Sequence, residues 1–74
     1  MSHKAIVEQC ERLGLAVGRE PSEGRRDWSA TGKRVRVYWS ASFEGGLLGL
    51  PRVIRNGVDT HARSLREIEY LVSL

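Results

Sequence analysis

The chain has 74 residues but only one cysteine, two histidines and two prolines. Because Cys10 is alone, an internal disulfide is excluded, and a single thiol fits a reducing compartment. His3 and His61 lie far apart in the sequence and do not give, with Cys10, the ligand spacing of a metal site. We therefore expect no bound metal, and a fold that depends on its own core or on a partner chain.

Long apolar runs are also missing. No segment approaches the roughly 18 residues of a membrane span, and the start, "MSHKAIVEQC", lacks the apolar centre of a signal peptide. The segment "GLLGLP" lacks the lysine and the following serine or threonine of a P-loop. We therefore expect a cytoplasmic protein with no membrane contact and no cofactor.

The composition is that of a small folded domain, with 41% apolar and 28% charged residues. The length allows one domain, residues 1–74. A domain of this size buries only about 60% of the surface that its unfolded chain exposes. The core is therefore thin, and a homodimer is one way in which such a chain gains stability.

An apolar stripe at helical spacing predicts a first helix over residues 3–13, with Ser2 as its cap. Ile6, Cys10 and Leu13 recur at intervals of four and three. At the other end, "SLREIEYLVSL" begins with a serine and has a glutamate three residues later, which is the pattern of a capping box. This segment predicts a second, C-terminal helix.

Alternating apolar residues predict strands between the helices, at "LAVGRE" (residues 15–20) and at residues 26–30, 34–40, 52–55 and 58–62. Asn56-Gly57 favours the tight turn that needs two positive φ angles. The segment "GREPSEGRR", residues 18–26, reads as a loop. We predict an α+β fold of two layers, in which both helices lie on one face of a three- or four-stranded antiparallel sheet.

The net charge of +3 is concentrated in residues 19–36, which hold six of the twelve Lys and Arg residues against three carboxylates. Within the strand at 34–40, Val35, Val37 and Trp39 alternate with cationic and aromatic residues, so we expect the two sets to lie on opposite faces. The predicted nucleic-acid-binding residues are Arg25, Arg26, Lys33, Arg34, Arg36 and Tyr38.

Such residues combine the charge that neutralises phosphates with a ring on which a base can stack. The same arginines could hold an acidic protein surface. They could equally be the solvated face of an antiparallel sheet, because a sheet with helices on one side must present polar residues on the other.

The segment "FEGGLLGLP" contains four apolar residues among glycines, and these are Phe43, Leu47, Leu48 and Leu50. They are either a cover for the core or an interface for a partner protein or a second copy. Asp59 and His61 are the one pair that resembles a general base, because residues two apart in a strand share a face. No sequence pattern assigns a nucleophile to that pair.

The stretches "AIVEQCERLGLAV" and "GRRDWSATGKRVRVYWS" resemble HicA-type mRNA interferases, the toxins of toxin–antitoxin pairs. The matching features are a helix that ends at Leu13-Gly14, a short strand, a glycine before the next strand, and a "GKRVRV" strand after a turn. The resemblance implies an αβββα fold similar to double-stranded-RNA-binding domains. The "GKRVRV" hairpin is also similar to the arm-site DNA-binding domains of phage integrases.

The interferase family carries its catalytic histidine just after that glycine. In this chain the positions after Gly24 are held by Arg25, Arg26, Asp27 and Trp28. We therefore predict no enzyme and no catalytic residue, and a binding module whose leading partner is nucleic acid or a complex that handles nucleic acid. The first alternative is a regulator or inhibitor that binds a protein, of the accessory type that phages encode. The second is an interferase-like ribonuclease that uses His61 and Asp59.

Overall fold

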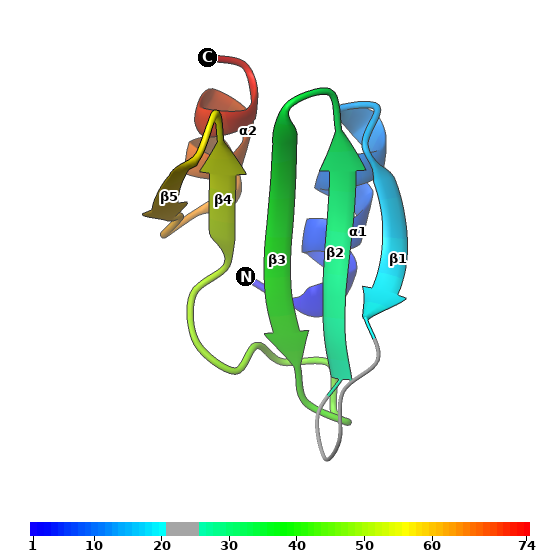
Figure 1. The fold of residues 1–74 in the computed structure, drawn as a ribbon. Helices are drawn as coiled ribbons and strands as arrows, with labels where there is room; N and C mark the ends of the chain where they lie inside the picture. The colour runs from blue at the N-terminus through cyan, green and yellow to red at the C-terminus, as the bar shows by residue number, and fades with distance from the viewer. Residues whose placement is uncertain (21–25) are drawn as a thin grey trace.

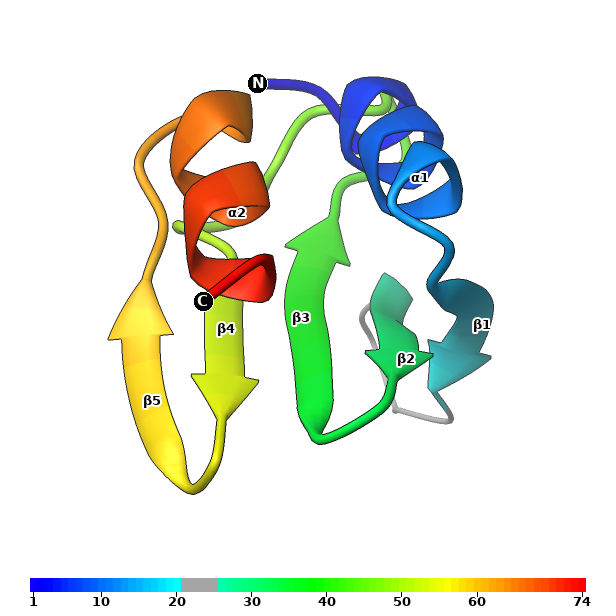
Figure 2. The same ribbon diagram turned by 90° about the horizontal axis from the view of Figure 1, so that it is seen from above.

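The computed structural model describes residues 1–20 and 26–74, and in this part of the chain two helices and five strands form. In chain order they are α1 (His3–Arg12), β1 (Ala16–Glu20), β2 (Arg26–Gly32), β3 (Val35–Ala41), β4 (Arg52–Arg55), β5 (Val58–His61) and α2 (Leu65–Val72). The strands form an antiparallel sheet in the order β1-β2-β3-β4-β5, and both helices pack on one of its faces (Figure 1, Figure 2). The α+β class is confirmed, with five strands instead of three or four.

Side-chain caps fix where the helices begin. Ser2 Oγ accepts a hydrogen bond of 3.1 Å from the backbone N–H of Ala5, so Ser2 caps α1 as expected. Ser64 Oγ accepts one of 3.1 Å from the N–H of Glu67 at the start of α2. The Glu67 carboxylate reaches back to the N–H of Arg63, one residue earlier than a standard capping box would place it.

Two tight turns fix the register of the central strands. Asn56 and Gly57, at φ 50° and 81°, connect β4 to β5 as the sequence predicts. Lys33 and Arg34 connect β2 to β3, and Arg34 adopts φ 61°. The expectation that Arg34 lies within the strand is therefore wrong, because β3 begins at Val35.

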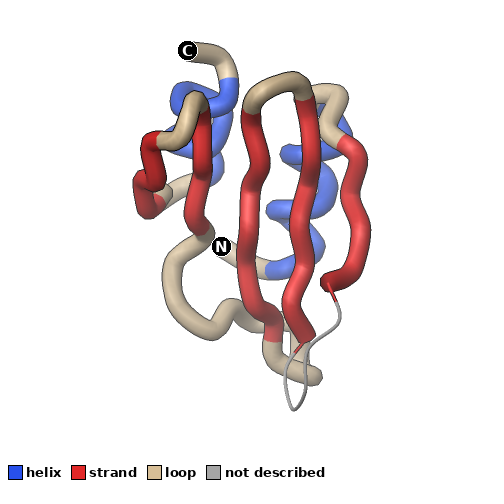
Figure 3. Tube along the Cα trace, viewed as in Figure 1, coloured by secondary structure: helices blue, strands red, loops and turns tan. Residues whose placement is uncertain are grey.

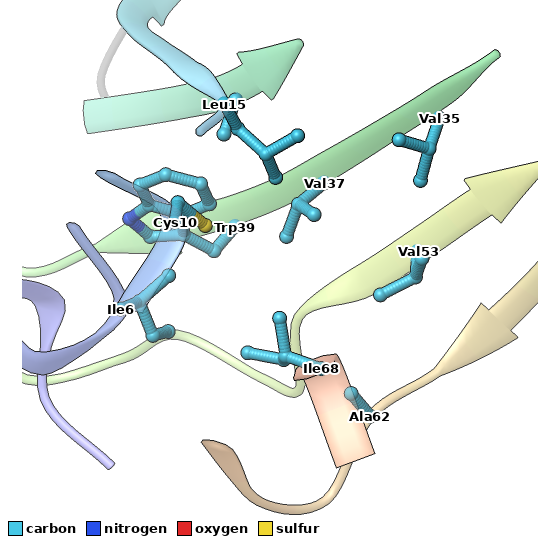
Figure 4. Packing of buried hydrophobic residues seen from close by; sticks show 10 residues of the cluster. Ile6, Cys10, Leu15, Val35, Val37, Trp39, Val53, Ala62 and Ile68 are labelled. Carbon is cyan, nitrogen blue, oxygen red and sulfur yellow. The ribbon is translucent and has the colours of Figure 1, made fainter. Parts of the chain in front are cut away.

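The core lies between the helices and the sheet (Figure 4). Val37 and Val53 from the sheet meet Ile6 and Cys10 of α1 and Ile68 of α2, and each of these side chains is fully or almost fully buried. The predicted inward face of β3 is confirmed, since Val35, Val37 and Trp39 all belong to this cluster. Gln9 is a buried polar residue that the apolar stripe did not reveal, and its amide Nε2 donates to the carbonyl of Leu65.

Two connecting segments differ in how well the sequence predicted them. The loop expected at residues 18–26 is shorter, because β1 continues to Glu20 and β2 begins at Arg26, where the two strands pair. Residues 21–25 lie outside the described residues. Residues 42–51, which join β3 to β4, form no helix or long strand (Figure 3). They are held to the end of β3 by the bridge of Leu47 to Ala41 and by the N–H of Leu48, which donates to the carbonyl of Ser40.

Candidate functional site

The sheet face opposite the helices, which we call the open face, carries the candidate site. Strand register places Arg36, Tyr38 and Ser40 of β3 on this face, beside Asp27 and Ser29 of β2. The strand β4 adds Arg52 and Ile54, and β5 adds Asp59 and His61. Figure 1 views the sheet from this side, with both helices behind it.

The predicted basic residues are distributed over three regions instead of one face. Arg36 and Tyr38 do lie on the open face. Lys33 and Arg34 are exposed at the β2–β3 turn. Arg26 lies on the helix side of β2, where its guanidinium carbon is 5.4 Å from the centre of the Phe43 ring. Arg25 lies outside the described residues, so the structure assigns it no place.

Arg36 is engaged by neighbours on the open face. Its Nη2 lies 3.4 Å from Oε1 of Glu20, and its guanidinium stacks 4.9 Å from the centre of the Tyr38 ring. Glu20 also accepts a hydrogen bond of 2.6 Å from the hydroxyl of Ser29. The arginine is therefore half-exposed within an ion pair, with Tyr38 as a platform beneath its guanidinium.

Arg52 occupies the other side of the same ring. Its guanidinium carbon is 5.9 Å from the centre of Tyr38, and Nε and Nη2 donate hydrogen bonds to the carboxylate of Asp59. These hydrogen bonds hold the pKa of Asp59 below its ordinary value and raise the pKa of Arg52. Sequence alone does not indicate that Arg52 belongs to the site, since only the register of β4 against β3 shows that it faces Tyr38.

The open face is not a positive surface. Among the described residues, Arg36 and Arg52 share it with three carboxylates, those of Glu20, Asp27 and Asp59. Asp27 accepts a hydrogen bond of 2.5 Å from the Ser40 hydroxyl. In the part of residues 19–36 that the structure describes, the cationic side chains are thus not gathered above Tyr38, which removes the main support for a continuous polyanion-binding face.

The four apolar residues of the 43–50 segment separate into three environments. Leu47 packs against the core and acts as part of its cover. Phe43 is 86% exposed beside Arg26. Leu48 and Leu50 are 52% and 48% exposed. Of the four residues, Leu47 therefore covers the core, and the other three are exposed.

An open pocket of about 400 Å³ lies at the end of the open face nearest this segment, and we call it the sheet-face pocket. Its lining includes Glu20, Asp27, Tyr38, Leu48, Leu50 and Arg52. The pocket combines two half-exposed leucines, an aromatic ring and charged groups that are already paired, which suits an apolar side chain with a polar neighbour.

The two histidines have different environments. Asp59 and His61 share the open face of β5 as predicted, but the Asp59 carboxylate is bound by Arg52. His3 is in the first turn of α1, where its Nδ1 accepts a hydrogen bond of 2.9 Å from Nε1 of Trp39. Burial, with a smaller contribution from nearby Arg26, lowers the pKa of His3.

The thiol of Cys10 is buried. Burial and the adjacent Glu11 raise the pKa of the Cys10 thiol to about 11, so the thiol is protonated at neutral pH. Within residues 1–20 and 26–74, no group of three or more His, Cys, Asp or Glu side chains is placed to hold a metal ion. In the same residues, neither helix has the length and apolarity that crossing a membrane requires.

Comparison with other proteins adds no assignment. No family model, curated protein or solved structure matches this chain.

Proposed function

We propose that this chain is a non-enzymatic binding module that docks a segment of a partner protein in the sheet-face pocket, as a small regulator or inhibitor does. The observation that carries the proposal is the position of Leu48 and Leu50. Both remain about half exposed beside Tyr38, while Leu47 of the same segment is used by the core. Exposed apolar side chains at the edge of a pocket, with paired polar groups around them, are typical of a protein-binding surface.

The lining of the pocket indicates the chemistry of the partner. A bulky apolar side chain fits against the two leucines and the Tyr38 ring. The charged groups of the lining are already engaged within the chain: Glu20 with Arg36, Asp27 with Ser40, and Arg52 with Asp59. We therefore expect the docked segment to carry a leucine-, isoleucine- or phenylalanine-like residue next to an uncharged polar residue.

The same charges argue against nucleic acid or an acidic protein surface as the occupant of this pocket. A phosphate above Tyr38 would approach the carboxylates of Glu20 and Asp59, and both guanidinium groups nearby are already paired with them. Association driven by release of counterions needs cations that are free to pair with phosphates. Arg34, which was expected to complete that cationic row, lies at the turn.

The free energy of burying Leu48 and Leu50 sets the size of the expected change in Kd. Fully burying a leucine side chain is worth about 1.5–3 kcal/mol, so burying the exposed half of Leu48 contributes about 1 kcal/mol. This corresponds to roughly a five-fold change in Kd, and replacing both leucines gives roughly thirty-fold.

The test is a peptide array of varied sequence, probed with the labelled wild-type chain, with Leu48→Ser/Leu50→Ser and with Phe43→Ser. We expect bound peptides to share a bulky apolar residue beside an uncharged polar one. Their Kd values should rise about thirty-fold in the double variant and change little with salt. Phe43→Ser is the matched control, because it also removes an exposed apolar side chain, but one that is not in the pocket.

Two outcomes contradict the proposal. One is binding to the double variant that equals binding to the wild-type chain. The other is a set of bound peptides that is acidic, since acidic peptides would indicate capture by arginines instead of by the leucines.

A second candidate function, nucleic-acid binding, has one observation in its favour. Lys33 and Arg34 are adjacent and exposed on the β2–β3 turn, and no ion pair joins either of them to another described residue. The β4–β5 turn lies against this one, with the N–H of Asn56 donating to the carbonyl of Arg34 at 3.3 Å. Two free cations at a protruding turn can contact phosphates without involving the open face.

This candidate is tested by fluorescence anisotropy with labelled single-stranded and duplex oligonucleotides at increasing salt. Binding through the turn predicts a Kd that rises steeply with salt and loss of binding in Lys33→Glu/Arg34→Glu. Arg63→Glu/Arg66→Glu is the matched control for the change in net charge. Equal loss in both double variants indicates attraction by overall charge only, and contradicts a site at the turn.

A further inference from the structure

The outer edge of β5 and the apolar groove beside it have no function in the proposal above. The strand β5 is the last in the sheet and pairs only with β4 among the described strands (Figure 1). A two-residue turn makes Arg55 and Val58 a hydrogen-bonded pair, and such pairs alternate along an antiparallel ladder. The backbone groups of Val58 and Thr60 therefore point at β4, and those of Asp59 and His61 point to the open edge.

Apolar surface continues from this edge onto the helix side of the sheet. A groove of about 290 Å³ lies between β4, β5 and the end of α2, and it is lined mainly by Val53, Val58, Leu71 and Leu74. Val58 is 65% exposed and Leu74 is 59% exposed. An unpaired strand edge beside exposed apolar side chains is a surface onto which a further strand can add.

We propose that this edge pairs with β5 of a second copy of the chain, which gives a two-fold-symmetric homodimer with a continuous ten-stranded sheet. Antiparallel pairing of β5 with itself satisfies the outward N–H and C=O groups of Asp59 and His61 in both copies. The symmetry brings the two apolar grooves together on the helix side, because the face of each residue is the same in both copies.

Charge complementarity selects the register. In an antiparallel pair of β5 strands, residues whose backbone N–H and C=O groups point outward must lie opposite each other. This condition allows the two-fold axis to pass through residue 59, 60 or 61. An axis at Asp59 would place two carboxylates opposite each other, which is unfavourable. An axis at His61 would set Asp59 opposite Arg63, which is not in a strand and whose N–H already donates to Glu67.

An axis at Thr60 has neither disadvantage. Asp59 of each copy then lies opposite His61 of the other, as a hydrogen-bonded pair whose side chains meet on the open face. The two Thr60 residues face each other directly at the axis, on the helix side. The exposed Val58 of each copy lies diagonally from Thr60 of the other, so its side chain becomes covered where the two grooves meet.

The first experiment is sedimentation equilibrium of the whole chain from micromolar to millimolar concentration, for the wild type, Val58→Lys and Leu48→Lys. We expect a reversible dimer in the wild type and in Leu48→Lys, and at least a ten-fold weaker dimer in Val58→Lys, because an edge lysine opposes strand addition. Leu48→Lys is the matched control, since it places the same charge on an exposed apolar residue of the sheet-face pocket. A monomeric wild type at millimolar concentration, or a dimer lost only in Leu48→Lys, would overturn the proposal.

The second experiment tests the register with single cysteines on strand β5, oxidised with glutathione disulfide. Thr60→Cys should form an interchain disulfide, because the two copies of this residue are directly opposed at the axis. Thr31→Cys, on β2 and far from the edge, should not. Preferential cross-linking of Asp59→Cys or His61→Cys would overturn this register, and absence of any cross-link would overturn the paired edge. Failure of peptide docking at Leu48 leaves both results unaffected, so the two proposals fail separately.

Discussion

The hydrogen bond between His3 and Trp39 should contribute substantially to the free energy of unfolding. Trp39 is almost completely buried, and its indole Nε1 donates to Nδ1 of His3 at 2.9 Å. The His3 ring also packs 4.6 Å from the Trp28 ring. In His3→Ala the buried indole donor loses its acceptor, which costs about 1–3 kcal/mol. Loss of the ring contact adds about 0.5–1.5 kcal/mol.

The effect is large for this chain, because the free energy of unfolding of a domain this size is on the order of 4–11 kcal/mol. The assay is urea denaturation followed by tryptophan fluorescence. The His3→Asn variant is the matched control, since its amide Oδ1 can take the place of Nδ1 as acceptor. We expect His3→Asn to retain most of the free energy of unfolding that His3→Ala loses.

The same bond gives a dependence on pH. Burial of the imidazole, with a smaller contribution from Arg26, lowers the pKa of His3 in the folded state. Protonation of Nδ1 would also remove the acceptor of the hydrogen bond from Trp39. As the pH falls, the imidazole of His3 therefore binds a proton in the unfolded chain before it does so in the folded chain, at its ordinary pKa of about 6.5. The stabilisation from His3 is complete above that value and is lost as the pH falls through the lower folded pKa.

The wild type should thus lose more stability between about pH 8 and about pH 5 than His3→Asn, which cannot titrate at this position. If both proteins lose the same amount, or if His3→Ala is as stable as the wild type, the bond does not support the fold as described.

Three further predictions concern the core and the helix ends. Gly32→Ala should lower the free energy of unfolding by about 1–3 kcal/mol in urea denaturation, because an added Cβ would collide with Leu15; an unchanged midpoint would contradict that close approach. Ser64→Ala should cost about 1 kcal/mol in thermal unfolding through loss of the α2 cap, and a Tm equal to that of the wild type would show that the cap contributes nothing. Cys10 should react with a thiol reagent only as fast as the protein unfolds, and rapid labelling of the folded chain would contradict its burial.

Local sequence signals predicted the elements well. Periodicity located both helices and most of the strands, and Asn56-Gly57 identified a turn that needs positive φ at two successive residues. The inward face of β3 followed from alternation alone. These features are decided within a few residues of the chain, which is why they can be seen without knowledge of the tertiary structure.

The candidate site was less predictable, since its partners come from different strands. The ion pair of Arg36 with Glu20 depends on the register of β1 against β2 and β3, and the position of Arg52 beside Tyr38 depends on β4. The turn at Lys33 and Arg34 has its positive φ at an arginine instead of a glycine, so turn propensity alone favours a turn within "ATGK", residues 30–33. Among the described residues, Arg26, Arg34 and Arg36 therefore lie in three different places although they are close in the sequence.

A ¹H–¹⁵N NMR titration shows whether the sheet-face pocket, and not a cationic surface, receives the partner. The chain is titrated with the tightest peptide from the array and, separately, with an oligonucleotide. We expect the peptide to shift the amide signals of Tyr38, Leu48 and Arg52 in a saturable way. Saturable shifts confined to Lys33 and Arg34 with either ligand, and none around the pocket, would contradict it.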